Sequence, residues 1–173
     1  MRYTTRPALR GHAVIVIALL AILAGAPEAG ARAKKAPRCP TMTEPLAKTL
    51  FDDWNKALQA PNHDPSRVVQ LYAANAVLLP TKENGPLIGH AQIRGYFAKF
   101  LEQDPVGHID SRAIVPAPCN IGVVAGLYTF KLTENRVRVD VPARYTYVYV
   151  YQGGHWLIAH HHSSAQPKKG EEP

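Results

Sequence analysis

The sequence predicts an α+β domain. Hydrophobic residues recur at helical spacing up to about residue 104, and from there to about residue 163 they alternate as they do in β-strands. The chain of 173 residues is 46% hydrophobic and 19% charged, which is a globular composition with room for one domain, at most two. These observations exclude a disordered or a fibrous protein.

The first 33 residues have the organisation of a secretory signal peptide. Basic residues precede an apolar run of 14 residues from Ala13 to Ala26, and Ala31-Arg32-Ala33 is typical of a cleavage site. The run is shorter than the roughly 20 residues that cross a bilayer. We therefore expect cleavage after Ala33 and a periplasmic or secreted protein without stable membrane insertion. An uncleaved signal anchor is the alternative.

The charge of the chain does not favour nucleic acid as a partner. Removing the signal peptide removes four arginines and Glu28, which lowers the formal net charge from +7 to +4. The remaining basic residues are scattered, with pairs only near the two termini, and they form no stripe interleaved with aromatic residues.

Three helices are predicted after a basic leader at 34–42. Thr43 is a plausible N-cap, with Pro45 in the first turn, for an amphipathic helix that ends near residue 60. Asp64 can cap a short second helix through 65–72, which runs into an extended segment at 76–80. A third helix follows Gly89 and ends near residue 104. The apolar positions of the first helix are Leu46, Leu50, Trp54, Ala57 and Leu58, and those of the third are Ile93, Tyr96, Phe97, Phe100 and Leu101.

Four antiparallel strands are predicted at about 107–116, 121–133, 136–151 and 155–163. Gly153 and Gly154 suit a tight hairpin turn between the last two strands. Such a turn pairs residues whose numbers sum to 307. One face then carries Arg144, Thr146, Val148 and Val150 with Leu157, Ala159, His161 and Ser163. The other face carries four tyrosines at 145, 147, 149 and 151 with Trp156, Ile158, His160 and His162.

Both faces of this hairpin are too apolar to be left in water. Helices in a domain of this size can cover only one face, so we expect the other to contact a second copy of the chain. The predicted oligomer interface is the aromatic face, namely Tyr145, Tyr147, Tyr149, Trp156, Ile158, His160 and His162.

Cys39 and Cys119 are the two cysteines of the chain. An even count in an oxidising compartment predicts one disulfide. Neither cysteine has a local context that would lower the pKa of its thiol, so neither is expected to be catalytic.

Several segments of this chain resemble bacterial homologues of the calcium/calmodulin-dependent protein kinase II association domain, within the nuclear transport factor 2-like superfamily. The residues that carry the resemblance are 76–80, the helix start at 89–97, Val141-Pro142-Ala143-Arg144-Tyr145-Thr146, and Trp156 to Ser164. It covers about residues 43–167.

The resemblance implies a cone of three N-terminal helices packed on a curved antiparallel sheet, with a pocket between them, in a domain spanning 43–164. The tail at 165–173 is expected to be disordered. Kinase activity is not implied, because the chain has neither a Gly-rich nucleotide loop nor the kinase catalytic motifs. We expect a self-assembling domain that binds a small polar or anionic organic molecule. The alternative is a small lyase or isomerase of the ketosteroid-isomerase or polyketide-cyclase type.

The expected ligand-binding residues are Arg144, Tyr128, Thr146, His161 and Ser163. In the kinase hub the pocket contains arginines that can hold a carboxylate; matching the strands places Ser163 at one of those positions and Tyr128 near another. Arg144 is costly to bury without a partner. It either pairs with a carboxylate of this chain, such as Asp110, or awaits an anionic ligand.

For catalysis, Asp110 or His161 is the candidate base and Tyr128 or Arg144 the candidate donor. The three consecutive histidines at 160–162 suggest a metal, but no Asp, Glu or Cys of the neighbouring strand shares their face, so none is expected. The aromatic stripe also suggests a flat cofactor such as a flavin. Without a phosphate-binding glycine loop, packing is the better interpretation and no cofactor is expected.

Overall fold

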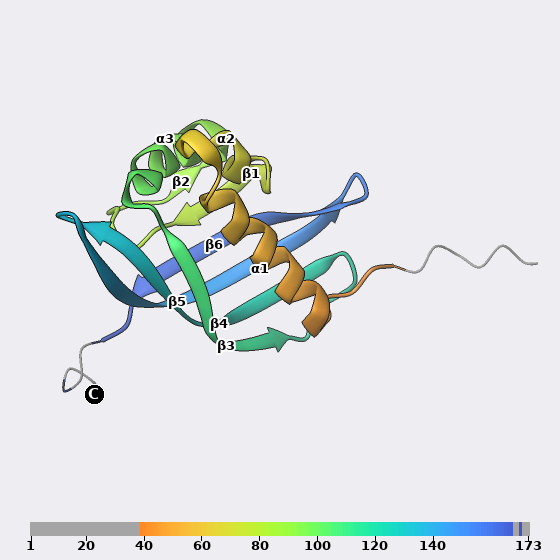
Figure 1. Ribbon diagram of the computed structural model, residues 1–173. Coiled ribbons are helices and arrows are strands. Elements are labelled where there is room, and N and C mark those ends of the chain that lie inside the picture. The colour runs from red at the N-terminus through yellow and green to blue at the C-terminus, as the bar shows by residue number, and fades with distance from the viewer. Residues whose placement is uncertain (1–38, 168–169, 171–173) are drawn as a thin grey trace, which may run out of the picture. The chain divides into compact units, whose positions relative to one another are not determined.

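The structure, a computed structural model, describes residues 39–167 and residue 170. The predicted signal peptide and residues 34–38 of the leader lie outside the described residues. The helices lie against one face of a six-stranded sheet (Figure 1). The elements in chain order are α1 (Glu44–Leu58), η1 (Pro61–His63), α2 (Ser66–Val69), β1 (Tyr72–Leu79), β2 (Leu87–Ile88), α3 (Gly89–Phe100), η2 (Leu101–Gln103), β3 (Val106–Val115), β4 (Ile121–Glu134), β5 (Val137–Gln152) and β6 (His155–Ala165).

Helix α1 begins where the sequence predicts. The Thr43 side chain accepts a hydrogen bond of 3.4 Å from the backbone N–H of Leu46, and Pro45 lies in the first turn. The buried side chains are Ala47, Phe51, Trp54 and Leu58. Leu46 and Leu50 are only half-buried, so the buried face is turned by about one residue from the predicted one. Trp54 belongs to both faces and lies at the centre of the core.

The sheet is mixed, whereas the sequence suggested an antiparallel one. Its strand order is β2-β1-β6-β5-β4-β3, and β1 runs parallel to β6 while all other neighbours are antiparallel. Strand β1 includes residues 76–79 of the predicted extended segment and begins at Tyr72, which the sequence placed in the second helix; that helix ends at Val69. The chain leaves it through β2 and α3, builds β3 to β5, and returns beside β1 in the same direction. A local pattern cannot show this non-local pairing.

A β-bulge in β6 changes which residues share a face. Next to the turn the pairing follows the predicted sum of 307, as in Tyr149 with Ile158. Beyond it Val148 pairs with His160 and Tyr147 with His161, so Ala159 is an extra residue in β6. The predicted faces are therefore wrong beyond Ala159. His161 lies on the tyrosine face, and residues 160 and 162 lie on the opposite one.

The tyrosine face packs against the helices. The prediction of an oligomer interface on this face is therefore wrong. Tyr145, Tyr147, Tyr149 and Ile158 are at most 4% exposed and belong to the hydrophobic core. They are buried because α1 covers this face, so they cannot contact a second copy. Of the other predicted interface residues, Trp156 is half-buried against Tyr151, while His160 and His162 point to the opposite side of the sheet.

The C-terminal tail is ordered for longer than predicted. Ala165 still pairs with Ala143 in the sheet, and the Gln166 backbone N–H donates to the carbonyl of Pro142 at 3.3 Å. Residues 168–169 and 171–173, to which the prediction of disorder also applies, lie outside the described residues.

Candidate functional site

A cavity lies between the helices and the inner, tyrosine-bearing face of the sheet. Its volume is about 50 Å³. It opens toward the loop that follows β1. Its lining is largely aromatic and aliphatic, and consists of Trp54, Leu78, Pro80, Thr81, Lys82, Tyr96, Phe97, Phe100, Tyr128, Phe130, Leu132, Val141, Ala143, His161 and Ser163.

A chain of hydrogen bonds runs from the core to this cavity. Trp54 Nε1 donates to Tyr72 Oη at 3.2 Å, and Tyr72 Oη lies 2.9 Å from His161 Nδ1. On the other side of the imidazole ring, His161 Nε2 lies 3.5 Å from Tyr128 Oη. Tyr128 Oη in turn donates to Ser163 Oγ at 2.6 Å. His161 thus connects a buried donor of α1 with hydroxyl groups of the cavity.

The chain continues to the mouth of the cavity. Ser163 Oγ lies 2.8 Å from the hydroxyl oxygen of Thr81, which is exposed. Beside it, Lys82 Nζ donates to Glu134 at 2.8 Å, so the cation at the mouth is already paired. The rings of Tyr96 and Phe100 stack in the cavity wall with centroids 5.7 Å apart. The mouth therefore combines hydroxyl groups with an apolar, aromatic wall.

The hydrogen-bonding capacity of the side chains sets the direction of this chain. The indole of Trp54 can only donate, so the hydroxyl proton of Tyr72 is free to be donated to His161 Nδ1. Nδ1 is then an acceptor, and a neutral imidazole carries its proton on Nε2 and can donate it toward Tyr128. Trp54 thus donates to Tyr72, and Tyr72, His161 and Tyr128 each accept from the core side and donate toward the cavity, where Ser163 accepts from Tyr128.

Burial keeps His161 neutral. The residue is 3% exposed, and burial, followed by the nearby His160 and His162, lowers its pKa to about 3. Its ring also stacks on that of Tyr147 with centroids 4.2 Å apart. Burial raises the pKa of Tyr72 and of Tyr128 as well. Near neutral pH these groups act as hydrogen-bonding groups rather than as charges.

Three of the five predicted ligand-binding residues meet in the cavity. Tyr128, His161 and Ser163 line it together. Arg144 and Thr146 do not, because the bulge leaves them on the opposite face with Ser164 and His162. Arg144 is exposed and its Nε donates to Ser164 Oγ at 3.2 Å, so it needs neither an internal carboxylate nor a ligand.

The candidate base Asp110 is also outside the cavity. It lies at a bulge in β3, where it accepts hydrogen bonds from Thr129 at 2.7 Å and lies 3.0 Å from His108. The pairing of Asp110 with Arg144 is therefore wrong. Within residues 39–167 no Asp or Glu side chain lines the cavity. His161, the other candidate base, is present there but has a pKa far below neutral pH.

Sequence reasoning missed three members of the hydrogen-bond chain, Trp54, Tyr72 and Thr81. Trp54 and Tyr72 read as ordinary apolar positions of helices, and Thr81 as a loop residue. A weak signal was available, since buried Trp and Tyr usually find a hydrogen-bond partner. Their shared partner, His161, could not be identified while the register of β6 was wrong.

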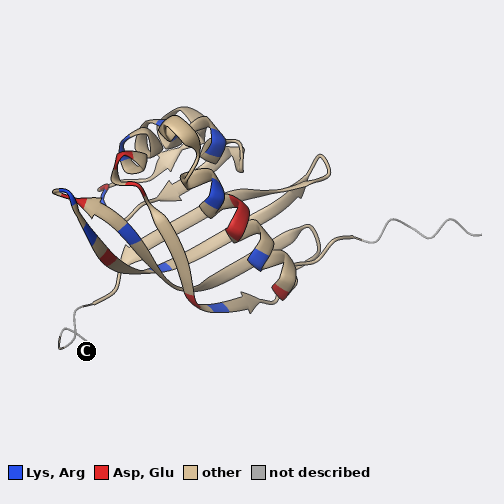
Figure 2. Cartoon of the chain, viewed as in Figure 1, with Lys and Arg blue, Asp and Glu red and all other residues tan. Residues whose placement is uncertain are grey.

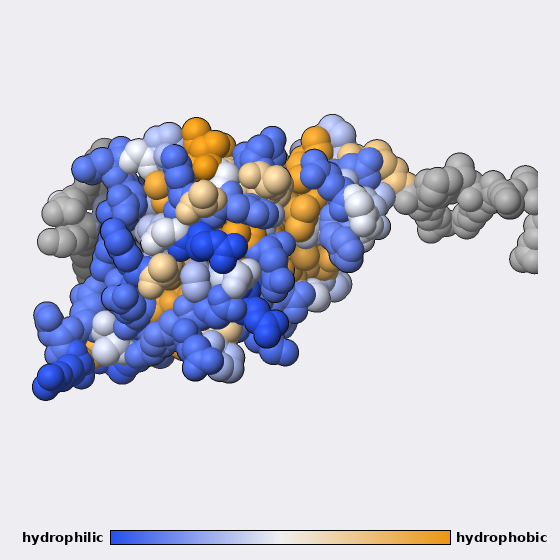
Figure 3. All heavy atoms as spheres, turned by 90° about the horizontal axis from the view of Figure 1, so that it is seen from above, coloured by the Kyte–Doolittle hydropathy of each residue, from blue (hydrophilic) through white to orange (hydrophobic). Residues whose placement is uncertain are grey.

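Among the described residues no helix covers the outer face of the sheet (Figure 1), and the part of this face around Val148 is apolar. Val148 and Val123 pair across β5 and β4, and Val115 and Ile121 nearby are 45% and 37% exposed. The segment 145–165, which forms most of the β5–β6 hairpin, contains no Lys, Arg, Asp or Glu. Figure 2 shows it without charged residues. By contrast, the face seen in Figure 3 is mainly hydrophilic. Such a sheet face is typical of an interaction surface.

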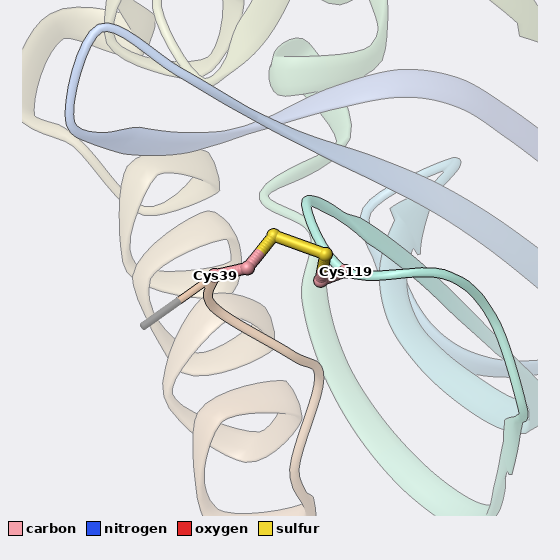
Figure 4. The surroundings of a disulfide bond; sticks show 2 residues. All are labelled: Cys39 and Cys119. Atoms are coloured by element: carbon pink, nitrogen blue, oxygen red, sulfur yellow. A yellow bond between two sulfur atoms is a disulfide. The ribbon is translucent and has the colours of Figure 1, made fainter. Parts of the chain in front are cut away.

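The two cysteines form the disulfide that their even count suggests (Figure 4). It fixes the leader to the β3–β4 loop, where Asn120 also donates its backbone N–H to the carbonyl of Pro40 at 2.8 Å. A disulfide is compatible with an extracellular location. None of the helices in the described part of the chain is long and apolar enough to cross a membrane.

Comparison with solved structures defines the class of this fold. The chain is similar to a nuclear transport factor 2-like protein from Pseudomonas putida KT2440, with 17% identity over 75% of this chain and 91% of that chain and a TM-score of 0.60. It is also similar to a ketosteroid isomerase-like protein from Erwinia carotovora atroseptica SCRI1043, with 16% identity over 73% and 100% of the two chains and a TM-score of 0.57. The fold is nuclear transport factor 2-like.

The family follows from closer matches. Residues 46–167 match the profile of the calcium/calmodulin dependent protein kinase II association domain. A protein from Xanthomonas campestris described by the same domain name is 42% identical over 76% of this chain and 94% of that chain, with a TM-score of 0.68. The chain belongs to this association domain family. No match was found among proteins of curated function.

Proposed function

We propose that this chain is an exported domain without kinase activity, which binds a small polar organic molecule in the cavity at His161 and assembles with copies of itself. The observation that carries the proposal is the chain of hydrogen bonds that ends in the cavity. It places hydroxyl groups in an aromatic pocket, as binding sites for small molecules do. The proposal that the domain is exported rests on the predicted signal peptide, and a disulfide is compatible with an extracellular location.

Self-assembly is supported by the family and by the outer sheet face. The chain belongs to an association domain family, and the aliphatic side chains around Val148 form an apolar surface that no helix of the described residues covers. Because the tyrosines are in the core, the interface is proposed on this opposite face.

Binding is favoured over catalysis by the chemistry of the cavity. An isomerase or lyase that moves a proton needs a base that is unprotonated, accessible and matched to the working pH. Within the described residues His161 is the only titratable base that lines the cavity besides the paired Lys82, and its pKa of about 3 makes it a weak base. The ketosteroid isomerase-like neighbour supports the fold alone, so an isomerase or lyase remains the second candidate.

A cavity-filling variant tests the proposal. Ala143 lines the cavity and is 2% exposed, so Ala143→Leu occupies the space a ligand would take. A set of small neutral and charged organic molecules is titrated by protein-detected NMR into wild type and variant. We expect shifts at Tyr128, His161 and Ser163 in wild type only. Ala113→Leu on exposed β3 is the control and should bind as wild type. Equal binding by Ala143→Leu, or no binding by wild type, would contradict the proposal.

A further inference from the structure

The protons of the cavity hydroxyls can be counted. Tyr128 donates its proton to Ser163, and the oxygens of Ser163 and Thr81 are 2.8 Å apart. Two hydroxyl protons, one on Ser163 and one on Thr81, serve a single bond between these residues. One proton is therefore left over at the mouth, on Ser163 if Thr81 donates and on the exposed Thr81 if Ser163 donates. The chain delivers a hydrogen-bond donor to the cavity.

The preceding bonds strengthen this donor. In a chain of hydrogen bonds that all point the same way, each group is polarised by the one that donates to it. A hydroxyl that accepts from Tyr128 becomes a better donor and offers less of its oxygen to a further donor. The site should therefore prefer a ligand atom that accepts a hydrogen bond.

The charges around the mouth select among acceptors. Lys82 is the one cation among the described residues that line the cavity, and it is bonded to Glu134 at 2.8 Å. Arg144 lies on the other face of the sheet. A carboxylate in the cavity would lose its hydration without gaining an unpaired cation, which is unfavourable. A neutral acceptor loses much less on entering.

The dimensions of the cavity fit a small acceptor group on an apolar body. A volume of about 50 Å³ is one third of the roughly 150 Å³ cavity that accommodates benzene. The enclosed part therefore holds about two to four non-hydrogen atoms, which is the size of a carbonyl group with its substituent carbons. The rest of a ligand would lie at the mouth, against Pro80 and the stacked rings of Tyr96 and Phe100.

We propose that the cavity recognises a neutral carbonyl compound with an apolar body, whose oxygen accepts the free hydroxyl proton of the Ser163–Thr81 pair. This inference rests on the proposed ligand-binding function and names the class of its ligand.

Three matched probes test the inference: cyclopentanone, cyclopentanol and cyclopentanecarboxylate. Their affinities for the wild-type protein are measured by NMR titration at pH 7. The oxygen of cyclopentanol can also accept the hydroxyl proton, but its own proton would be buried without an acceptor, which costs about as much as one hydrogen bond. Cyclopentanone should therefore bind up to about tenfold more tightly than the alcohol, and more tightly than the carboxylate, which loses its hydration. The infrared C=O stretch of bound cyclopentanone should also shift to lower frequency than in an apolar solvent, because its oxygen accepts a hydrogen bond.

Two tyrosine variants separate the relay from general effects on the fold. Tyr128→Phe removes the group that polarises Ser163, whereas Tyr145→Phe removes a hydroxyl that bonds the Ser111 carbonyl outside the cavity. The preference for cyclopentanone over cyclopentanol should fall several-fold in Tyr128→Phe and stay unchanged in Tyr145→Phe. Should Tyr128→Phe not fold, the infrared shift in wild type decides.

The outcomes distinguish this inference from the proposed function. Tighter binding of the alcohol or the carboxylate at Tyr128 and Ser163 would overturn the carbonyl assignment and leave ligand binding in place. An unshifted C=O stretch in the bound state would also overturn it. If none of the three probes, nor any member of the wider set, bound to the cavity, both the inference and the proposed function would fail.

Discussion

At the scale of single residues, His161 joins the core to the cavity. One ring nitrogen faces Tyr72 in the core and the other faces Tyr128, and the ring itself stacks on Tyr147. A neutral imidazole satisfies this arrangement with one donor and one acceptor. A protonated ring would have to donate from both nitrogens and would bring a charge into the core. The neutral state is therefore part of the folded structure.

The acid sensitivity of the fold should depend on His161. Its pKa is lowered from 6.5 in the ordinary state to about 3 in the folded protein, so the unfolded chain binds the extra proton. Stability is then fully present above about pH 6.5 and falls as the pH drops toward 3, by a few kcal/mol (order of magnitude). His161→Gln should be less stable at neutral pH, yet lose less stability on acidification. Urea unfolding between pH 7.5 and 4.5 measures how the free energy of unfolding changes with pH in wild type and in the variant.

The control for this comparison is His155→Gln, because the His155 side chain is exposed beside the β5–β6 turn and lies outside the hydrogen-bond chain. Its pH slope should match that of wild type. The same slope in wild type and in His161→Gln would show that His161 is not the group whose protonation opposes folding.

Alanine variants of two arginines test the conclusion that Arg144 is exposed and belongs to no buried ion pair. Arg144→Ala should change the free energy of unfolding of the monomer by less than about 0.5 kcal/mol, because the side chain is exposed and, among the described residues, bonds only Ser164. Arg112→Ala should cost about 1–2 kcal/mol, since the Arg112 side chain is 12% exposed and is paired with Glu44. Chemical denaturation of both variants at low protein concentration measures this. A loss of several kcal/mol in Arg144→Ala would restore the buried ion pair that the structure excludes.

At the scale of elements, the local parts of the fold could be predicted and the pairing of distant segments could not. Thr43 and Pro45 mark the start of α1, and the Gly153-Gly154 turn, with φ of 58° and 86°, fixes the first pairs of the β5–β6 hairpin. Ala159 carries no such signal. Alanine is as compatible with a regular strand as with a bulge. One unpaired residue moves every later residue of the strand to the opposite face of the sheet.

This single residue explains most of the errors about the site. With the regular register His161 and Ser163 shared a face with Arg144, and the tyrosines faced outward. With the bulge His161 and Ser163 join Tyr128 instead, and Arg144 is left outside. The family resemblance nevertheless points to Tyr128 and Ser163 as ligand-binding residues, and the regular register adds His161 because it places this residue on the same face as Ser163. Their partners in α1 and β1 depend on contacts that no strand pattern contains.

The disulfide fixes the leader element to the β3–β4 loop, and its removal should be costly. Cys39 and Cys119 are 80 residues apart, and closing a loop of that length is worth about 4 kcal/mol in the chain-entropy model. The double variant Cys39→Ser/Cys119→Ser should lose stability of this order, measured by denaturant unfolding. Wild type kept under reducing conditions is the matched comparison. Labelling of unreduced protein should find no free thiol, and two reactive thiols per chain would contradict the bridge.

At the scale of the whole molecule, the account assigns different tasks to the two faces of one sheet. The inner face encloses the cavity, and the outer face is the one on which we propose that copies of the chain assemble. Val148→Glu places a charge in the apolar outer face and should convert wild-type oligomers to monomers, because a buried unpaired charge is strongly unfavourable in an interface. Val137→Glu is the control, since Val137 is 59% exposed at the β4–β5 turn. Sedimentation at micromolar concentration measures both; a monomeric wild type would contradict the proposed assembly.

The most direct test of this division of the sheet is the affinity of Val148→Glu for cyclopentanone. It is measured by NMR titration at a protein concentration at which sedimentation shows the variant to be monomeric. The account predicts the same affinity as in oligomeric wild type, because every residue of the hydrogen-bond chain and of the cavity wall comes from one copy. A monomer that folds normally but no longer binds cyclopentanone, while wild type does, would show that the cavity depends on a second copy and would contradict the account.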